Sequence, residues 1–131
     1  MPSESIPKKI PPKRILVVDD EPQVADTIRM VLAYGGHTVE VAEDANRALA
    51  VFETGKYDLV ISDLALGKMN GLDLARAIKG RSPKQPIMLI TAYAESVSMG
   101  GDRLANIDFL LGKPFSLEQL QEGLNKIFHA P

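Results

Sequence analysis

The sequence predicts an α/β fold in which a five-stranded parallel sheet carries helices on both faces. Short apolar runs alternate along the chain with segments whose apolar residues recur every three or four positions. The first pattern is typical of strands buried in a parallel sheet, and the second is typical of amphipathic helices. Five strand–helix pairs follow one another, which predicts a doubly wound parallel sheet with five helices.

Four of the predicted strands are almost entirely apolar, and a polar or charged residue follows each of them directly or after one glycine. They are residues 15–18, 59–61, 87–90 and 107–111. A fifth run, residues 38–41, alternates apolar and polar side chains, which indicates a strand at the edge of the sheet.

The first two helices are predicted from the residues that begin and end them. Pro22 suits the first turn of a helix, and Gly35 with Gly36 terminates that helix. Asp44 can cap a second helix, which we expect to extend to a closing glycine, Gly55.

The remaining helices differ in the strength of their signals. Residues 71–79 carry apolar side chains at helical spacing, and Ser116 with Gln119 forms a capping box for the last helix. A helix is also expected over residues 95–105, but two adjacent glycines there each lower helix propensity by about 1 kcal/mol relative to alanine.

Composition indicates one domain of a soluble protein. The chain has 131 residues, a net charge of −2 and no cysteine. Residues 1–13 hold four of the nine prolines and predict a flexible tail, leaving residues 14–131 as the domain. The weak net charge gives no overall attraction to nucleic acid, and no apolar run approaches the roughly 20 residues that span a membrane. We expect a cytoplasmic protein that binds neither nucleic acid nor membrane.

The polar residues that follow the strands form a consistent chemical set. Asp19 and Asp20, Asp63, Thr91 and Lys113 follow four different strands. Each alone is a common turn or loop residue. Ligands of open α/β sheets bind at the carboxyl ends of the strands, so the joint occurrence favours a functional site at this rim.

This set is suited to phosphoryl transfer. Three neighbouring carboxylates repel one another unless a cation neutralises them, and oxygen ligands favour Mg²⁺. One carboxylate could then act as a nucleophile. The Lys113 ammonium and the Thr91 hydroxyl could bind phosphoryl oxygens. His37 and His129 have no partners at metal-ligand spacing, and we expect both to be solvated.

Five blocks of the sequence resemble the receiver domain of response regulators. They are ILVVDDE at 15–21, YDLVISD at 57–63, MNGLDLARAIK at 69–79, PIMLITAYA at 86–94 and LGKPF at 111–115. The resemblance implies that residues 14–131 are a receiver domain with a flavodoxin-like fold and strand order 2-1-3-4-5. It also implies a two-component or phosphorelay signalling role.

The resemblance implies a function for each residue of the rim. Asp63 would be the phosphoacceptor. Asp19 and Asp20 would bind Mg²⁺ together with Asp63 and the backbone carbonyl of Ala65, with Asp20 as the expected direct ligand.

Further implications concern the phosphoryl group and its donor. Thr91 and Lys113 would contact the phosphoryl group, and the Lys113–Pro114 peptide bond would be cis. Tyr93 and Ala65 would tune the hydrolysis of the acyl phosphate. The donor would be a phosphohistidine on a histidine kinase or phosphotransfer protein.

The sequence departs from the family pattern in the switch region. Leu110 stands where the family has an aromatic residue, and Phe109 is expected to point to the opposite face of the strand. Leu66 and Gly67 stand where the family usually has Met and Pro. In the family, a threonine hydroxyl moves and an aromatic ring follows it inward. With these departures, the sequence does not decide whether this coupled movement occurs here.

Three functions remain open at this level. The favoured one is a signalling switch with a downstream protein target, which is not an enzyme beyond its own phosphorylation and dephosphorylation. The second is a receiver-like adaptor that no longer undergoes cycles of phosphorylation and acts by protein contacts. The third is a phosphatase with an Asp nucleophile. The resemblance also implies that the face of the fourth helix, fifth strand and fifth helix can form a homodimer.

Overall fold

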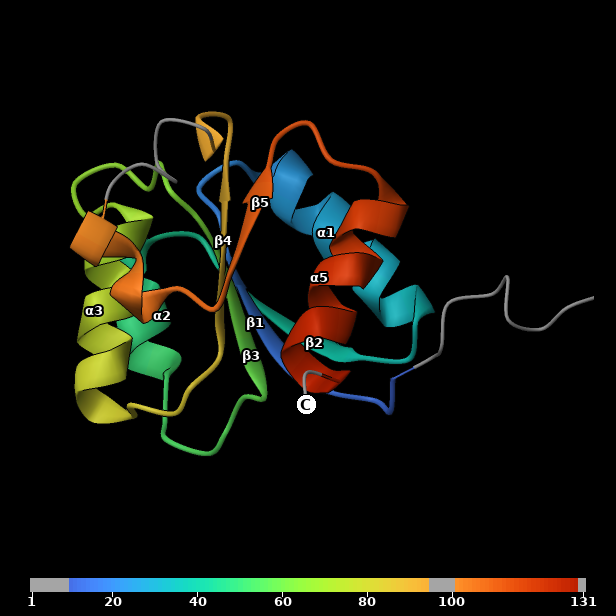
Figure 1. Ribbon diagram of the computed structural model, residues 1–131, viewed down its shortest axis with the longest axis horizontal. Coiled ribbons are helices and arrows are strands. Elements are labelled where there is room, and N and C mark those ends of the chain that lie inside the picture. Colours follow the sequence, from blue (N-terminus) through green and yellow to red (C-terminus); the bar gives the residue numbers. More distant parts are fainter. Residues whose placement is uncertain (1–9, 95–100, 130–131) are drawn as a thin grey trace, which may run out of the picture.

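The computed structural model describes residues 10–94 and 101–129, which form a parallel sheet between two layers of helices (Figure 1). The strand order is β2-β1-β3-β4-β5, so the order 2-1-3-4-5 is confirmed. The strands are β1 (Arg14–Val18), β2 (Thr38–Ala42), β3 (Leu59–Asp63), β4 (Ile87–Thr91) and β5 (Phe109–Gly112). The helices are α1 (Pro22–Tyr34), α2 (Ala45–Val51), α3 (Gly71–Arg81), the 3₁₀-helix η2 (Gly101–Asn106) and α5 (Leu117–His129).

Two apolar cores lie on opposite faces of the sheet because side chains alternate along each strand. In β1, Ile15 and Val17 pack with α1 and α5, whereas Leu16 and Val18 pack with α2 and α3. Figure 1 shows α1 and α5 on one side of the sheet and α2 and α3 on the other. Burial on both faces explains why the inner strands are almost entirely apolar.

A side-chain cap fixes where helix α2 begins. The Asp44 carboxylate accepts a hydrogen bond of 2.7 Å from the backbone N–H of Arg47 at the start of α2. This cap was predicted, but the predicted end at Gly55 was wrong. Helix α2 ends at Val51, and Gly55 lies in the following turn at φ +83°.

The predicted capping box before α5 is confirmed. The Gln119 side chain accepts from the backbone N–H of Ser116 at 2.8 Å, and the Ser116 hydroxyl accepts from the backbone N–H of Gln119 at 3.1 Å. These two bonds satisfy backbone donors that have no partner within the first helical turn.

The segment expected as the fourth helix differs from the prediction. Residues 95–100 lie outside the described part of the chain, and residues 101–106 form η2 rather than an α-helix. Glycine lowers α-helix propensity, and the 3₁₀ segment begins at one of the two glycines, Gly101. The described ranges 10–94 and 101–129 therefore contain four α-helices and one 3₁₀-helix, and none of these helices could cross a membrane.

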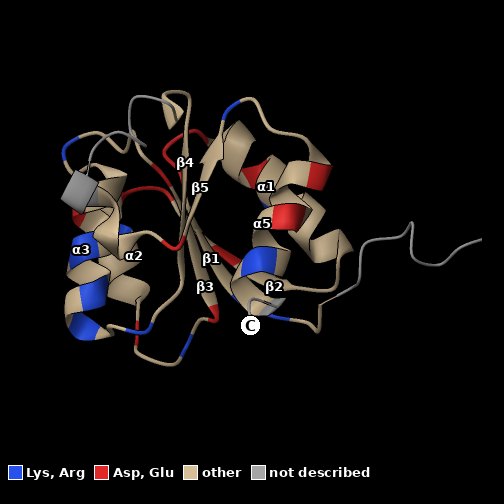
Figure 2. Ribbon diagram, viewed as in Figure 1, with Lys and Arg blue, Asp and Glu red and all other residues tan. Residues whose placement is uncertain are grey.

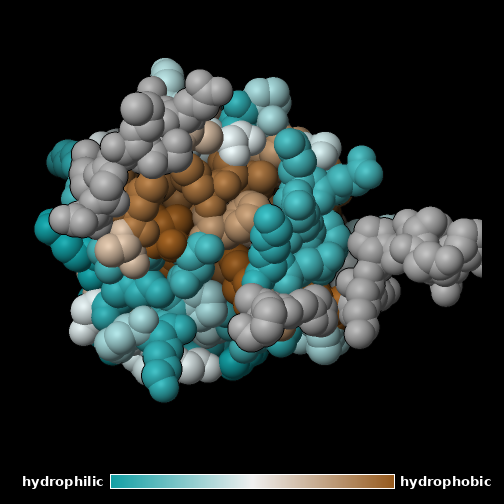
Figure 3. Space-filling view, viewed as in Figure 1, coloured by the Kyte–Doolittle hydropathy of each residue, from teal (hydrophilic) through white to brown (hydrophobic). Residues whose placement is uncertain are grey.

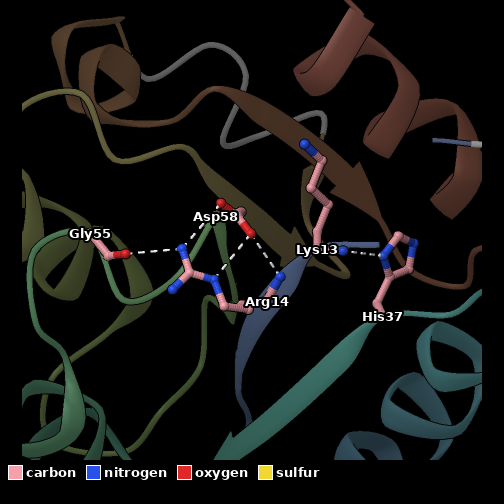
Figure 4. Close-up of polar contacts among 5 residues, drawn as sticks. All are labelled: Lys13, Arg14, His37, Gly55 and Asp58. Carbon is pink, nitrogen blue, oxygen red and sulfur yellow. Dashed lines mark hydrogen bonds and ion pairs between the residues drawn. The ribbon is translucent and has the colours of Figure 1, made fainter. Parts of the chain in front are cut away.

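An ion pair ties β1 to the segment before β3 at the amino ends of the strands (Figure 4). The Asp58 carboxylate accepts from the backbone N–H of Arg14 at 2.8 Å and from its guanidinium at 3.5 Å. The same guanidinium donates to the carbonyl of Gly55 at 3.0 Å. Partial burial of the Asp58 carboxyl raises its pKa, but the hydrogen bonds and charge of Arg14 outweigh burial, so the pKa of Asp58 is lowered.

The chain before β1 is also anchored at this end. The imidazole Nδ1 of His37 accepts a 3.0 Å hydrogen bond from the backbone N–H of Lys13, as Figure 4 shows. Ile10 is buried against the core formed with α1 and α5. His37 is buried rather than solvated, so that prediction was wrong, and the side chain of His129 lies outside the described part of the chain. The packed chain therefore includes residues of the segment 1–13 that was predicted as a tail.

Helix α3 begins in direct contact with the end of β3. A Cβ atom on Gly71 would lie 2.4 Å from the carbonyl oxygen of Asp63 and 2.6 Å from Cδ1 of Leu89. The backbone N–H of Gly71 donates to the carbonyl of Leu64 at 2.7 Å. Only glycine fits here without displacing the backbone that carries Asp63.

Replacing Gly71 with alanine tests this contact. We expect Gly71→Ala to lower the free energy of unfolding by about 1–3 kcal/mol, since overpacking displaces backbone atoms. Gly80 of the same helix is the matched control, because a Cβ atom there meets nothing within 4 Å. Gly80→Ala should raise stability by up to about 1 kcal/mol. Urea unfolding followed by circular dichroism measures both, and equal effects of the two variants would contradict the close approach.

The Arg14–Asp58 pair predicts a pH dependence. A carboxyl with a lowered pKa contributes stability above its unfolded pKa and loses it as pH falls through the folded pKa. We expect Asp58→Asn to lose up to about 1 kcal/mol near neutral pH, because the pair is partly exposed. Unfolding in urea at several pH values should show this difference shrinking below about pH 4. If the stability difference between the two proteins stays constant to the lowest pH at which the protein is folded, the ion pair is not its cause.

Candidate functional site

Four strands deliver the candidate residues to one edge of the sheet. Strands β1, β3, β4 and β5 are parallel, and their register pairs Val18 with Ser62, Asp63 with Ile90 and Thr91 with Gly112. The residues that end or follow these strands therefore lie close together. This edge is uppermost in Figure 1, and Figure 2 shows an acidic loop there, after β1.

Four carboxylates gather at this edge. Oxygen atoms of Asp19, Asp20, Glu21 and Asp63 all lie within 4.8 Å of one another. Asp19 and Asp63 are buried, whereas Asp20 and Glu21 are exposed. Three of these acids were predicted from the sequence. Glu21 was missed, although its position directly after the Asp pair was an available signal.

Backbone bonds hold the acidic loop in place. The Asp19 carboxylate accepts from the backbone N–H of Glu21 at 2.9 Å, and the backbone N–H of Asp19 donates to the carbonyl of Ala42 at 3.1 Å. Pro22 occupies the first position of α1, where its fixed φ angle suits the helix and its missing N–H costs no hydrogen bond. The loop therefore turns sharply and keeps its acids at the sheet edge.

The Lys113 ammonium contacts the buried carboxylate at the centre of the cluster. Its Nζ atom lies 3.2 Å from Oδ2 of Asp63, which is 6% exposed. The backbone N–H of Lys113 donates to the carbonyl of Thr91 at 2.8 Å, and the Lys113–Pro114 peptide bond is cis, as expected. This contact and the backbone bond together hold the Lys113 side chain against the end of β3.

Thr91 is buried at the end of β4, and its hydroxyl lies in a local turn. The hydroxyl oxygen accepts from the backbone N–H of Tyr93 at 3.0 Å. The Tyr93 side chain is 69% exposed, at the rim of the site. A hydroxyl can accept one bond and still donate its own hydrogen, so Thr91 retains a donor for a ligand.

The loop after β3 contains the residues that depart from the family pattern. Leu66 is buried in the core formed with α2 and α3, and Gly67 adopts φ +84°, where glycine is favoured. Ala65 is exposed in the same loop, two residues after Asp63. Its carbonyl as a metal ligand stays a prediction.

Neighbouring residues of β5 face opposite sides of the sheet. Phe109 packs against the core with α1 and α5, and a Cβ atom on Gly123 of α5 would lie 2.8 Å from its ring. Phe109 therefore points toward α5, and Leu110, its neighbour in the strand, points toward the opposite face of the sheet. An aliphatic side chain stands at the expected switch position.

The acid cluster perturbs the protonation of Asp19. Burial raises the pKa of the Asp19 carboxyl, and the charges of Asp63 and Glu21 raise it further. The backbone bond from Glu21 and the charge of Lys113 act in the opposite direction without cancelling this rise. The metal-free arrangement is thus electrostatically unfavourable. An all-oxygen donor set of this kind fits a hard divalent cation such as Mg²⁺.

Comparison with known proteins identifies relatives over most of the chain. The family model of the response regulator receiver domain matches residues 15–125. Response regulator MprA of Mycolicibacterium vanbaalenii is 36% identical over 113 residues, which are 83% of this chain and 47% of that protein. The probable transcriptional regulatory protein TcrX of Mycobacterium tuberculosis is 35% identical over 113 residues, with the same coverage of 83% and 47%. This chain therefore spans about half the length of these curated relatives.

Solved structures show the same architecture. The response regulator TrrA of Thermotoga maritima, in complex with Mg(2+)-BeF, is 34% identical, with a TM-score of 0.81 over 88% of this chain and 99% of that chain. The chemotaxis protein CheY4 of Vibrio cholerae is 25% identical, with a TM-score of 0.81 over 90% of this chain and 100% of that chain.

The raised pKa of Asp19 predicts that this residue destabilises the metal-free fold. An acid whose folded pKa is raised contributes stability below its unfolded pKa and loses that contribution as pH rises through the folded pKa. We expect Asp19→Asn to be more stable than the wild type near neutral pH in a chelator. The gain should vanish below about pH 4, where the carboxyl is protonated in both states.

Urea unfolding of both proteins across this pH range measures the effect. Asparagine keeps an oxygen that can accept from the backbone of Glu21, so the comparison isolates the charge. Glu43→Gln, at an exposed acid outside the cluster, is the control and should show no comparable gain. A destabilised Asp19→Asn at neutral pH would contradict the electrostatic argument.

Proposed function

This chain belongs to the response regulator receiver family of two-component signalling proteins, and on that premise we propose that phosphorylation of Asp63 switches it. The observation that carries the proposal is the setting of the Asp63 carboxylate. It is buried at the end of β3, 3.2 Å from the Lys113 ammonium, and lies among three other carboxylates. A nucleophilic carboxylate with adjacent positive charge suits phosphoryl transfer.

The proposed reaction transfers a phosphoryl group from a phosphohistidine on a histidine kinase or phosphotransfer protein. A carboxylate oxygen of Asp63 attacks phosphorus, so a P–O bond forms as the P–N bond breaks. The electron pair of the broken bond stays on the imidazole nitrogen, which takes up a proton. Water then attacks phosphorus, the bond between phosphorus and the Asp63 oxygen breaks, and inorganic phosphate leaves while Asp63 returns to its carboxylate form.

The acid cluster would hold Mg²⁺ during this reaction. Asp19, Asp20 and Asp63 would supply carboxylate oxygens, and Ala65 would supply its backbone carbonyl. When bound, the ion offsets the negative charge of the phosphoryl oxygens. The raised pKa of Asp19 supports this role, because a divalent cation relieves the repulsion among the acids. The complex of TrrA with Mg(2+)-BeF is a precedent in a relative.

Lys113 and Thr91 would bind the phosphoryl group after transfer. The Lys113 ammonium pairs with Asp63 and could move its contact to a phosphoryl oxygen. The Thr91 hydroxyl accepts from the backbone of Tyr93 and could donate to a second oxygen. The exposed Tyr93 ring at the rim would limit the approach of water and thereby tune the lifetime of the acyl phosphate.

A specific observation favours a second candidate function, that of an adaptor which does not cycle. Leu110 stands at the switch position and the ring of Phe109 packs against Gly123 of α5, so the usual aromatic movement is not available to β5. An adaptor would keep one conformation and act through protein contacts. The intact set of acids and Lys113 supports the switch over the adaptor.

Intact-mass measurement tests the switch. After incubation with Mg²⁺ and acetyl phosphate, we expect one added phosphoryl group on the wild-type protein and none on Asp63→Asn or without Mg²⁺. Asp73→Asn, at an acid outside the cluster, is the control and should be modified like the wild type.

Two further readouts separate the alternatives. For a switch, the chemical-shift changes on adding beryllofluoride with Mg²⁺ should extend from Asp63 to β5. An adaptor would show no added phosphoryl group and no chemical-shift changes in β5. Continuous release of phosphate from a small phosphate ester would instead support the phosphatase alternative. A folded protein that binds Mg²⁺ but shows no adduct and no beryllofluoride response would overturn the switch.

A further inference from the structure

Glu21 contributes a fourth negative charge to the site, although no role in the phosphorylation chemistry requires it. Its carboxylate lies with those of Asp19, Asp20 and Asp63, with oxygen atoms within 4.8 Å of one another. Glu21 is the residue that precedes the first turn of α1, but its side chain makes no capping hydrogen bond to that helix. Helix capping therefore does not explain this side chain.

The position of Glu21 is fixed by the backbone on both sides. Its N–H donates to the Asp19 carboxylate at 2.9 Å, and its carbonyl accepts from the N–H of Ala25 at 3.0 Å. Pro22 follows it and restricts the preceding residue to extended backbone, which agrees with its φ of −100° and ψ of 107°. The backbone therefore holds Glu21 beside the site, and its exposed carboxylate is accessible to solvent and ions.

Charge counting shows what this carboxylate can do. Among the residues that the structure describes, four carboxylates gather at the site and the Lys113 ammonium contacts one of them, that of Asp63. A bound divalent cation reduces this excess of negative charge, and a phosphoryl group, carrying up to about two negative charges, restores it. The Glu21 charge therefore acts in opposite directions on the two ligands: it attracts the cation and repels the phosphoryl group.

We propose that Glu21 tunes the phosphorylation site electrostatically, strengthening the binding of the divalent cation while opposing the addition of the phosphoryl group to Asp63. This inference rests on the proposed function. In water at about 4 Å, one pair of unit charges changes an equilibrium constant roughly fivefold, and physiological salt screens part of this effect. Glu21 therefore makes the site more dependent on the cation and slows the addition of the phosphoryl group.

The test compares Glu21→Gln with the wild type in two measurements on the full chain. Calorimetric titration with Mg²⁺ should show affinity weakened by about three- to tenfold in the variant. At saturating Mg²⁺, phosphorylation by acetyl phosphate, followed by intact mass, should instead become faster by a few-fold, because the donor is an anion. Both changes should shrink in high salt, since screening weakens interactions of exposed charges.

Two controls separate charge from structure. Glu21→Asp keeps the charge and should resemble the wild type in both measurements. Glu53→Gln removes an exposed acid near Gly55, at the amino end of the sheet, and should also leave both unchanged. A structural defect at residue 21 would slow phosphorylation and weaken Mg²⁺ binding together, and this change in the same direction would overturn the inference.

The outcomes also distinguish this inference from the proposed function. Unchanged Mg²⁺ affinity in Glu21→Gln, with normal phosphorylation of the wild type, overturns the role of Glu21 and leaves the switch intact. Loss of all phosphorylation in Glu21→Gln at saturating Mg²⁺ would make Glu21 an essential ligand and would equally overturn a tuning role. If the wild type is not phosphorylated, the proposed switch function is wrong. The Mg²⁺ titration then still decides whether Glu21 attracts the cation.

Discussion

The parallel register of four strands is the constraint on which the site depends. Because β1, β3, β4 and β5 run in the same direction, their carboxyl ends meet at one edge. Asp63 pairs with Ile90 and Thr91 pairs with Gly112, so one residue beyond the last pair brings Lys113 to the same edge. A shift of one residue in any strand would turn its terminal side chain to the opposite face and would separate the ammonium from the carboxylate.

This geometry concentrates negative charge that folding alone would not favour. Asp19 and Asp63 are buried side by side, and the pKa of Asp19 is raised by burial and by its neighbours. Hydrophobic packing on both faces of the sheet supplies the stability that tolerates this repulsion. A site that is unfavourable without ligands can respond strongly to a cation and to a phosphoryl group, because each changes the balance of charge. The same electrostatics links the acids, Lys113 and Glu21 in a single system.

The contacts at the two ends of the sheet differ in kind. At the amino end, Arg14 and Asp58 join neighbouring strands, and His37 accepts a hydrogen bond from the chain that leads into β1. These contacts are satisfied within the protein and stabilise one arrangement. At the carboxyl end, the loop after β1 and the exposed acids leave oxygen atoms available to ligands. Gly71 connects this end to α3 by a contact too close for any side chain.

The sequence by itself determined the strands, most helix starts and the main acids, because each rests on local chemistry. Apolar runs mark strands buried on both faces, and the caps at Asp44 and Ser116 are short-range hydrogen bonds that a few residues specify. Only the tertiary structure decided which side chains meet across distant segments. It buried His37 against the chain before β1, ended α2 before Gly55 and placed the Glu21 carboxylate among the acids. Burial and charge proximity depend on packing between elements far apart in the chain. A local sequence pattern does not specify which of these elements come into contact.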